Sequence, residues 1–235
     1  MGPSINSGDF EPPVALCAER HRHYGFVNTP GAASKPNSLF APIALQEFAD
    51  VARCYPILFF NYETTFPVAI SGQIGEGHRR FSPSTELYRP AVHQLYPFIL
   101  EKLPGQDAGI LLFDPNGRQV VPMNETTEAQ PLFNRAGEPT DLLRQIADFA
   151  GKIHEGRQMA AAFAEALRSK GVLTPSRLEY NQPVGKGQKT HRLYMINEQA
   201  FRALPSSTVY EWFQNGFLDA AQLVLLSQRH WLSYQ

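Results

Sequence analysis

The sequence is poor in residues that cross-link a chain or anchor it in a membrane. Only two cysteines, Cys17 and Cys54, occur among 235 residues, and neither belongs to a Cys-x-x-Cys pair or has a histidine at zinc-finger spacing. We therefore expect no disulfide scaffold and a reducing, cytoplasmic location. The longest apolar runs, 56–60 and 110–113, are far shorter than the ~20 residues that span a bilayer. No membrane span is predicted, and residues 1–10 lack the pattern of a secretory signal.

The charges of the chain are balanced, so neither sign is in excess. There are 21 Lys and Arg against 22 Asp and Glu, a formal net charge of −1. Binding of a polyanion through counterion release would need a local basic stripe, and the sequence shows none. No nucleic-acid partner is therefore predicted. With 43% hydrophobic residues, and with proline and glycine spread along the chain, the composition indicates a soluble globular protein.

The first half of the chain predicts short elements. Residues 1–22 begin with a stretch rich in Gly, Ser, Pro and acidic residues, which predicts a flexible arm. A stripe of Leu45, Phe48 and Ala52 predicts a helix over 44–52, which Tyr55-Pro56 ends. The apolar runs 57–60 and 66–71 predict the two strands of a hairpin.

Two later segments carry mixed signals. Over 87–102 the helical spacing of Val92, Leu95 and Ile99 predicts one helix, which Pro97 breaks. Residues 108–113 predict a strand that enters a tight turn, and 118–123 predict its return strand.

The second half of the chain predicts mainly helices. One apolar stripe runs from Leu143 to Ile153, and another runs from Met159 to Leu167 in a second helix that Gly171 ends. The remaining expectations are a strand over 192–196, a short helix capped by Asn197, a helix whose capping box is Thr208–Glu211 and which Gly216 closes, and a last helix over 218–232. That last helix is so apolar that we expect it to be largely buried, in the core or in a homo-oligomer interface.

Together these elements predict the fold class α+β and a single domain over residues 23–235. A mainly antiparallel sheet comes from the N-terminal half, and the C-terminal helices cover one face. The strands are joined by short polar connections, whereas parallel strands need crossovers of a dozen or more residues.

Few residues form a pattern that carries chemistry. If their segment were a strand, His21 and His23 would share one face and could bind a transition metal, but no third ligand is identifiable, so neither a metal site nor a cofactor is predicted. No Gly-x-Ser-x-Gly nucleophile motif occurs. The segment 185–189, Gly-Lys-Gly-Gln-Lys, can cradle an anion through backbone N–H groups, although we favour a mobile hairpin loop as its explanation.

The order of several short motifs resembles the SapC family of bacterial proteins, from about His23 to the C-terminus. The pieces that carry the resemblance are Ala41-Pro42-Ile43, Glu47-Phe48, Tyr55-Pro56-Ile57-Leu58-Phe59, Pro67-Val68-Ala69-Ile70, Tyr88-x-Pro90-Ala91, Tyr96-Pro97-Phe98, Leu132-Phe133, Gly137-Glu138-Pro139-Thr140, Leu193-Tyr194-Met195-Ile196-Asn197-Glu198, Leu204-Pro205 and Asn215-Gly216-Phe217-Leu218. Where the family has paired arginines before Tyr-Pro-Phe, this chain has Gln94-Leu95, so an anion contact from those arginines is not expected here.

The resemblance implies a role without defining an activity. The family is associated with surface layers and their export genes, and other members with receptor and flavin-halogenase genes. Our first hypothesis is therefore a non-catalytic accessory protein of a surface-layer, export or product-modification pathway, with a protein or peptide partner. The alternative is an enzyme, with or without a metal, that acts on an amino acid or peptide. Across both hypotheses, the residues expected to line the groove or supply catalytic groups are His23, Glu47, Tyr55, Tyr88, Tyr96, Phe98 and Asp114.

Overall fold

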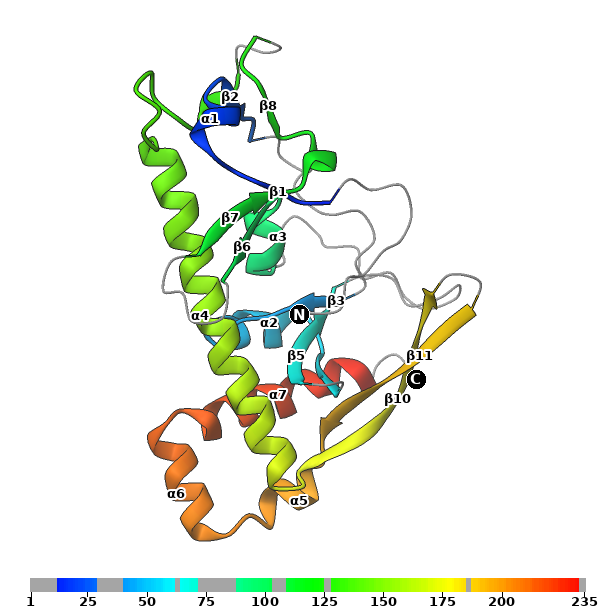
Figure 1. Ribbon diagram of the computed structural model, residues 1–235. Helices are drawn as coiled ribbons and strands as arrows, with labels where there is room; N and C mark the ends of the chain where they lie inside the picture. Colours follow the sequence, from blue (N-terminus) through cyan, green and yellow to red (C-terminus); the bar gives the residue numbers. More distant parts are fainter. Residues whose placement is uncertain are drawn as a thin grey trace. The chain divides into compact units, whose positions relative to one another are not determined.

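The structure is a computed structural model that describes residues 12–28, 40–61, 64–71, 88–102, 109–124, 128–184 and 187–232 (Figure 1). The chain divides into two compact units, and each is built from two separate stretches of sequence. Unit 1 takes residues 1–36 and 92–154, and unit 2 takes residues 37–91 and 155–235. The sequence predicted a flexible arm over residues 1–22. Residues 1–11 of this arm lie outside the described residues, and residues 12–22 contain strand β1 (Val14–Ala15) and helix α1 (Ala18–His21).

Unit 1 contains two small antiparallel sheets. In the first, the strand order is β1, β7 (Ile110–Phe113) and β6 (Phe98–Glu101). In the second, it is β8 (Val120–Pro122), β2 (Tyr24–Phe26) and β9 (Gln130–Pro131). Gly25 in β2 allows close packing here, because a Cβ at that position would lie 2.9 Å from both the Ala129 Cβ and the Gln130 carbonyl oxygen.

Unit 2 is built on a five-stranded antiparallel sheet with the strand order β10-β11-β4-β5-β3. The strands are β3 (Phe40–Pro42), β4 (Ile57–Asn61), β5 (Thr65–Ile70), β10 (Leu173–Val184) and β11 (Gly187–Ile196). The predicted hairpin of β4 and β5 is confirmed, with Ile57 opposite Ala69 and Phe60 opposite Phe66. The α+β fold class and its antiparallel sheets are thus as expected, although β10 and β11 come from the C-terminal half.

The two faces of this sheet are both buried. On one face Phe40, Leu58, Val68, Ile70 and Leu193 form an apolar cluster. On the other face the Phe59 ring contacts Phe163, a residue of the long helix α4, and the Phe163 ring also contacts Phe48 of helix α2 (Phe48–Cys54). The predicted helix over 44–52 corresponds to a 3-10 turn, η1 (Leu45–Glu47), that continues directly into α2.

Helix α4 (Asp141–Ser169) is a single helix of 29 residues, so the prediction of two helices in this region was wrong. No proline interrupts the segment, and the polar residues His154 and Glu155 continue the helix instead of separating two helices. The predicted end at Gly171 is confirmed. Gly171 has φ +68°, its N–H donates to the Arg168 carbonyl, and the next N–H, of Val172, donates to the Leu167 carbonyl, which together form a Schellman motif.

Two predictions for unit 1 were also wrong. The helix expected over 87–102 is confined to α3 (Ala91–Leu95), and after the cis Tyr96–Pro97 bond the chain forms strand β6, whose ladder with β7 supplies its backbone hydrogen bonds. Strand β8 does not return alongside β7 but pairs with β2. The reason is local, because the 3-10 turn η2 (Pro115–Gly117) ends at Arg118 with φ 53°, a left-handed conformation that redirects the chain.

The C-terminal helices of unit 2 are α5 (Glu198–Arg202), α6 (Ser206–Gln214) and α7 (Phe217–Leu232). Asn197 caps α5 as predicted, since its Oδ1 accepts a hydrogen bond from the Ala200 N–H. The capping box predicted at Thr208 was wrong, because α6 already begins after Pro205 and Thr208 is buried within it.

Helix α7 buries a narrower stripe than the sequence predicted. The buried positions are mostly small or polar, Ala220, Ala221, Val224, Ser227 and Gln228, whereas Leu225 is half-buried and Leu226 is 49% exposed. Ser227 explains part of this pattern, because its Oγ accepts a hydrogen bond from the Ile57 N–H of β4 at 3.0 Å and donates to the Val224 carbonyl. A small polar residue thus lets α7 approach the first residue of β4 closely.

Candidate functional site

The seven predicted site residues are divided between the two units. His23, Tyr96, Phe98 and Asp114 belong to unit 1, and Glu47, Tyr55 and Tyr88 belong to unit 2. Two tyrosine–carboxylate pairs form, one in each unit: Tyr88 with Glu47 and Tyr96 with Asp114. A groove that unites the seven residues stays a prediction.

Glu47 is the most fully hydrogen-bonded of these residues. It lies at the end of η1 and is 4% exposed. Its Oε2 accepts from the Ala44 N–H at 2.8 Å, and its Oε1 accepts from the Ala91 N–H at 2.6 Å and from the Tyr88 hydroxyl at 3.0 Å. One carboxylate therefore satisfies two backbone donors, of which Ala91 is 44 residues from Glu47 along the chain, and orients a phenol.

The electrostatics around Glu47 keep the Tyr88 hydroxyl protonated. Burial raises the Tyr88 pKa above its usual value, and the negative charge of Glu47, the hydrogen bond to it and the charge of Asp50 raise it further. Arg157, on the part of α4 that belongs to unit 2, supplies a compensating positive charge. Desolvation lowers the Arg157 pKa, and the charge of Glu47 opposes that shift. Tyr88 can therefore donate a hydrogen bond at neutral pH but cannot serve as a base.

Next to Arg157, Gly156 lets another side chain approach α4. Gly156 is buried, and a Cβ on it would overlap the side-chain amide of Gln46, the residue that precedes Glu47. Glycine within a helix lowers stability relative to alanine, and the close approach of Gln46 explains why position 156 is nevertheless a glycine. The consecutive residues Gly156 and Arg157 thus support the consecutive residues Gln46 and Glu47, a relation that the sequence did not reveal.

The pair in unit 1 is organised by a turn. Asp114 caps the N-terminus of η2 and is 8% exposed, and its Oδ1 accepts from the backbone N–H and the side-chain amide of Asn116, each at 2.9 Å. Its Oδ2 accepts from the Tyr96 hydroxyl at 3.2 Å. Burial first, and then the charge and hydrogen bond of Asp114, raise the pKa of Tyr96 to about 12. This tyrosine, like Tyr88, stays protonated at neutral pH.

The remaining predicted residues, Tyr55, Phe98 and His23, have different environments within their own units. Tyr55 is 2% exposed and Phe98 is 3% exposed, with the Phe98 ring against Phe26, so both are core residues. His23 is exposed in the turn between α1 and β2.

His21 and His23 do not lie on a strand, so the shared face that a strand would give them does not form. His21 ends α1, and its buried ring packs edge-on against Tyr24 and Phe113. Its Nδ1 lies 3.1 Å from the Cys17 carbonyl oxygen and 3.2 Å from the Cys17 nitrogen. Burial lowers the pKa of His21, the backbone contact with Cys17 opposes this, and Arg20 lowers the pKa further. Within the parts of the chain that the structure describes, no group of three or more His, Cys, Asp or Glu residues could hold a metal ion.

The model of the SapC family matches residues 16–233, nearly the whole chain. The chain belongs to the SapC family. No curated protein and no solved structure matches this SapC family member.

The structure of this SapC family member explains why two of its motif pieces occur together. Glu47 comes from the piece Glu47-Phe48, and its two Oε1 donors, Tyr88 and Ala91, are the ends of the piece Tyr88-x-Pro90-Ala91. The carboxylate therefore joins the two pieces directly, and we interpret this network as structural. No helix among the described residues of the SapC chain is both long and apolar enough to span a membrane.

Two features of the SapC chain were not found by sequence reasoning. Gln119 is 1% exposed, and neither its side-chain oxygen nor its side-chain nitrogen has a hydrogen-bond partner within the described residues. Helix α6 exposes its aromatic residues, with Tyr210 at 65% and Phe213 at 66% exposure, while Trp212 of the same helix is buried. The spacing of Val209, Tyr210 and Phe213 at i, i+1 and i+4 is the signal that could have revealed this face.

Proposed function

We propose that this SapC family member is a non-catalytic accessory protein that binds another protein through the exposed face of α6. The observation that carries the proposal is the exposed pair Tyr210 and Phe213, with Val209 beside them at 36% exposure. Aromatic side chains are enriched in the centres of protein interfaces and are seldom grouped on the surface of a monomer. The surface-layer, export or product-modification pathway is the context that the family resemblance implies.

The α6 face is suited to binding because it is ordered before a partner arrives. The Tyr210 hydroxyl accepts a hydrogen bond from the Gln214 side-chain amide at 2.8 Å, one turn further along the helix. On the opposite side, Thr208 and Trp212 are buried, and the Trp212 ring contacts Phe217 of α7. A helix held in this way loses little conformational freedom on binding, so more of the contact free energy appears as affinity.

The test compares two double variants in pull-downs from the bacterium that encodes the chain. Tyr210→Ser with Phe213→Ser removes the aromatic pair, whereas Met159→Ser with Leu226→Ser removes two exposed apolar residues from α4 and α7. We expect one captured protein that the first variant loses and the second retains, and that the purified partner rebinds with the same dependence. Equal capture by both variants, or no rebinding of the purified protein, would overturn the proposal.

Self-association is a distinguishable outcome of the same experiment. If the captured protein is a second copy of the chain, sedimentation at two concentrations ~100-fold apart shows a dimer that the aromatic variant loses. The sequence analysis also allowed a homo-oligomer whose interface is α7. Such an oligomer would instead be lost in the variant that carries Leu226→Ser, because Leu226 is the most exposed apolar residue described on α7.

The Glu47–Tyr88 pair beside Arg157 is the observation that favours the alternative of an enzyme acting on an amino acid or peptide. An argument against the enzyme is that the Glu47 carboxylate already accepts hydrogen bonds from three donors of the protein, so it has little remaining capacity to bind a substrate. Elemental analysis of the purified protein tests the metal-dependent form. Stoichiometric iron, zinc or copper that is lost in a His21→Ala and His23→Ala double variant would favour the enzyme, provided that circular dichroism shows the variant folded.

A further inference from the structure

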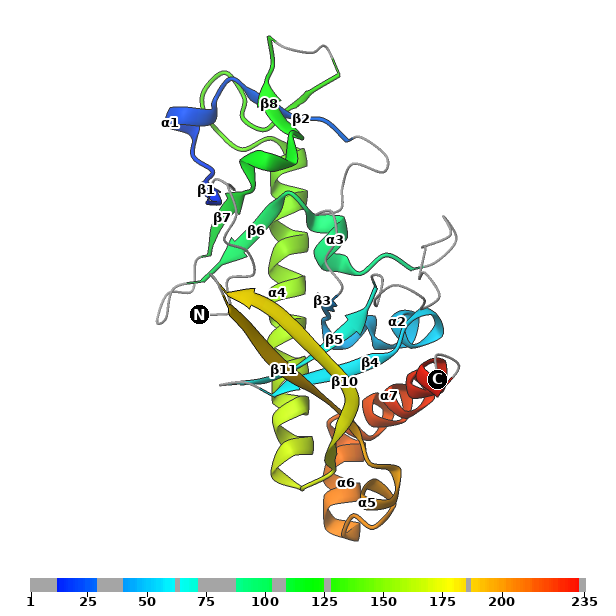
Figure 2. The same cartoon turned by 90° about the vertical axis from the view of Figure 1, so that its right-hand side faces the viewer.

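The sequence contains two Asn-Gly pairs, and the fold gives them different surroundings. The pair Asn116-Gly117 lies in η2 of unit 1, and the pair Asn215-Gly216 joins α6 to α7 in unit 2. Figure 2 shows the chain changing direction between α6 and α7. The backbone nitrogen that follows an asparagine can attack its side-chain carbonyl, and a glycine in that position hinders the attack least because it has no Cβ.

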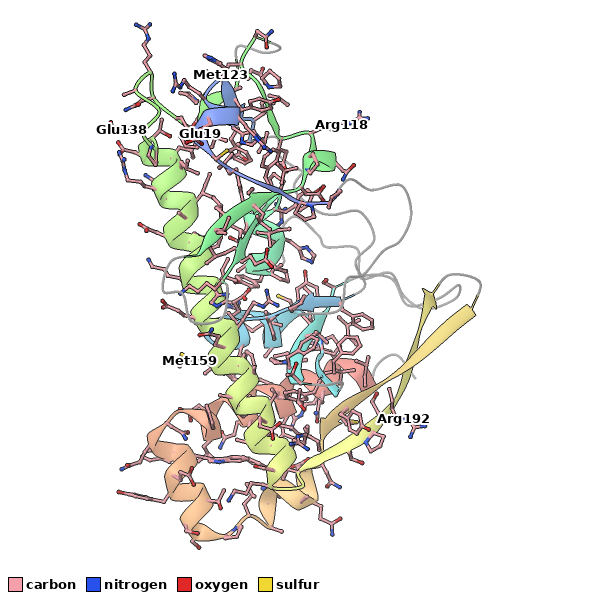
Figure 3. The ribbon with its side chains drawn as sticks, viewed as in Figure 1. Glu19, Arg118, Met123, Glu138, Met159 and Arg192 are labelled. Carbon is pink, nitrogen blue, oxygen red and sulfur yellow. The ribbon has the colours of Figure 1, made fainter. Side chains whose placement is uncertain are left out.

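Exposure to solvent does not distinguish the two pairs. Asn116 and Asn215 are both exposed, and the glycine that follows each of them is half-buried. Figure 3 shows the side chain of Arg118, the residue after the first pair, pointing outward from η2, and Arg118 is exposed. Water therefore reaches both turns, and any difference in their reactivity must come from hydrogen bonds and local packing.

The pair in η2 is held in place. The Asn116 side-chain amide donates to the Asp114 Oδ1 at 2.9 Å, and the Gly117 N–H donates to the Asp114 carbonyl oxygen at 3.1 Å. Gly117 is also crowded, since a Cβ on it would lie 2.9 Å from the Pro97 Cβ and 3.1 Å from the Tyr96 hydroxyl oxygen. The nitrogen that would attack is thus engaged, and the side chain that it would attack is fixed in another direction.

The pair between α6 and α7 is open. Within the described residues the Gly216 N–H donates to no acceptor, and a Cβ on Gly216 would meet no atom within 4 Å. The Asn215 Oδ1 accepts a hydrogen bond from the Phe217 N–H at 3.1 Å. This bond to the second residue along the chain folds the asparagine side chain back over the intervening peptide, which brings its Cγ towards the Gly216 nitrogen.

The Phe217 N–H also activates the Asn215 side chain for attack. Phe217 is the first residue of α7, and the N–H groups of the first turn form the positive end of the helix dipole. A donor in this position polarises the side-chain carbonyl and stabilises the negative charge that develops on Oδ1 when Cγ is attacked, as oxyanion donors do in enzymes.

We propose that Asn215 is a site of spontaneous deamidation in the folded protein, whereas Asn116 is protected. The Gly216 nitrogen gives its proton to water and forms a bond to the Asn215 Cγ, and the bond from Cγ to Nδ2 breaks, so that Nδ2 leaves as ammonia with a proton from water. Water then adds to either carbonyl of the resulting cyclic imide, which gives aspartate or isoaspartate. The junction gains one negative charge, and this inference does not depend on a partner of α6.

The experiment follows both pairs in the same sample of the full chain. The protein is incubated in mildly alkaline buffer, once folded and once unfolded in urea, and the peptides that contain each pair are quantified by mass spectrometry. In the folded chain we expect Asn215 to lose its amide at least about tenfold faster than Asn116, because its transition state has the oxyanion donor and a free attacking nitrogen. In urea we expect similar rates, and enzymatic methylation of isoaspartate gives a second readout.

Three variants assign the reaction to the two pairs. Asn215→Gln should abolish the isoaspartate signal of the folded chain and Asn116→Gln should retain it, because glutamine must close a larger ring and reacts far more slowly. Asp114→Ala removes an acceptor of the Asn116 side chain, so in the folded chain it should raise the Asn116 rate at least about threefold and leave the Asn215 rate unchanged. Near-UV circular dichroism shows that each variant is folded.

Several results would overturn the proposal. Equal rates at the two positions of the folded chain, or a faster reaction at Asn116, would show that the surroundings described above do not control the reaction. An intact Asn215 in the folded chain after the unfolded chain has reacted completely would show that the Phe217 N–H protects the side chain instead of activating it. An unchanged Asn116 rate in folded Asp114→Ala would refute the protection by Asp114.

Discussion

Single buried polar side chains hold distant segments of this protein together. Glu47 satisfies the N–H groups of Ala44 and Ala91, and Ser227 satisfies the N–H of Ile57. Each is a hydrogen bond to a backbone donor that would otherwise lose its partner on burial. The residues that sequence reasoning proposed for a groove include two such groups, Glu47 and Asp114, whose acceptors are already used inside the fold.

Gln119 and Gln228 make a matched pair of buried glutamines. Gln119 has no partner among the described residues, whereas the Gln228 amide, oriented to donate to the Ile196 carbonyl and to accept from the Ile196 N–H at 2.7 Å, has two. We expect Gln119→Leu to raise the free energy of unfolding by about 1 kcal/mol or more, and Gln228→Leu to lower it by about 1–3 kcal/mol. Urea titration measures both. A loss of stability in Gln119→Leu would mean that its amide has a partner, such as an ordered water.

The pH dependence of stability should depend on His21. Burial lowers its folded pKa below the unfolded value, so the folded state binds fewer protons. The stabilising contribution is present above pH ~6.5 and is lost as the pH falls through the folded pKa, with a slope of at most about 1.4 kcal/mol per pH unit.

The measurement is the free energy of unfolding of His21→Gln relative to wild type between pH 7.5 and pH 5. We expect the difference between the two proteins to shrink as the pH falls, because only the wild type must protonate a buried ring. His23→Gln, at an exposed position two residues away, is the control and should leave the pH profile unchanged. Parallel profiles for wild type and His21→Gln would contradict the assignment.

Among the elements, α4 shows how one helix can contain two glycines for different reasons. A Cβ on Gly151 would meet no atom within 4 Å, whereas a Cβ on Gly156 would overlap the Gln46 side chain. Gly151→Ala should therefore raise the free energy of unfolding by about 0.5–1 kcal/mol through helix propensity alone. Gly156→Ala should raise the free energy of unfolding by less than Gly151→Ala does, or should lower it, because the Gln46 side chain must move.

A double-mutant cycle on thermal or urea unfolding identifies the cause. In a Gln46→Ala background the obstacle is gone, and we expect Gly156→Ala to regain the benefit that Gly151→Ala shows. Coupling near zero between positions 46 and 156 would show that Gln46 does not explain the buried glycine.

For the molecule as a whole, the decisive feature is that each unit is assembled from two stretches of chain. Unit 2 surrounds Phe163, whose ring contacts Phe48, Phe59 and Phe217, all residues of the same unit. Unit 1 has its own ring contacts, such as Phe26 with Phe98. We expect such units to differ in their local stability.

Phe163→Ala tests this difference. Loss of a fully buried phenylalanine should cost roughly 3–5 kcal/mol, and hydrogen exchange should show reduced protection in β4, β5 and α7, with β6 and β7 much less affected. Met159→Ala, on the same helix but 54% exposed, should stay within about 0.5 kcal/mol of wild type. An equal loss of protection in β6 and β7 would show that the two units unfold together.

The sequence by itself determined the local elements. The helix through Phe48, the hairpin of β4 and β5, the Asn197 cap and the ends at Gly171 and Gly216 all follow from signals within a few residues of one another. Such signals reflect side-chain periodicity, capping and positive φ, which neighbouring residues decide. The α+β class followed from the same signals, because short connections favour antiparallel pairing.

Only the tertiary structure decided which partners these elements take. Strand β6 has a helical spacing of apolar residues, yet its ladder with β7 makes it a strand, and β8 pairs with β2 rather than with β7. The Glu47 network joins residues 41 and 44 positions apart. These outcomes depend on contacts between distant segments, whose free energies outweigh local propensity and leave no short-range mark in the sequence.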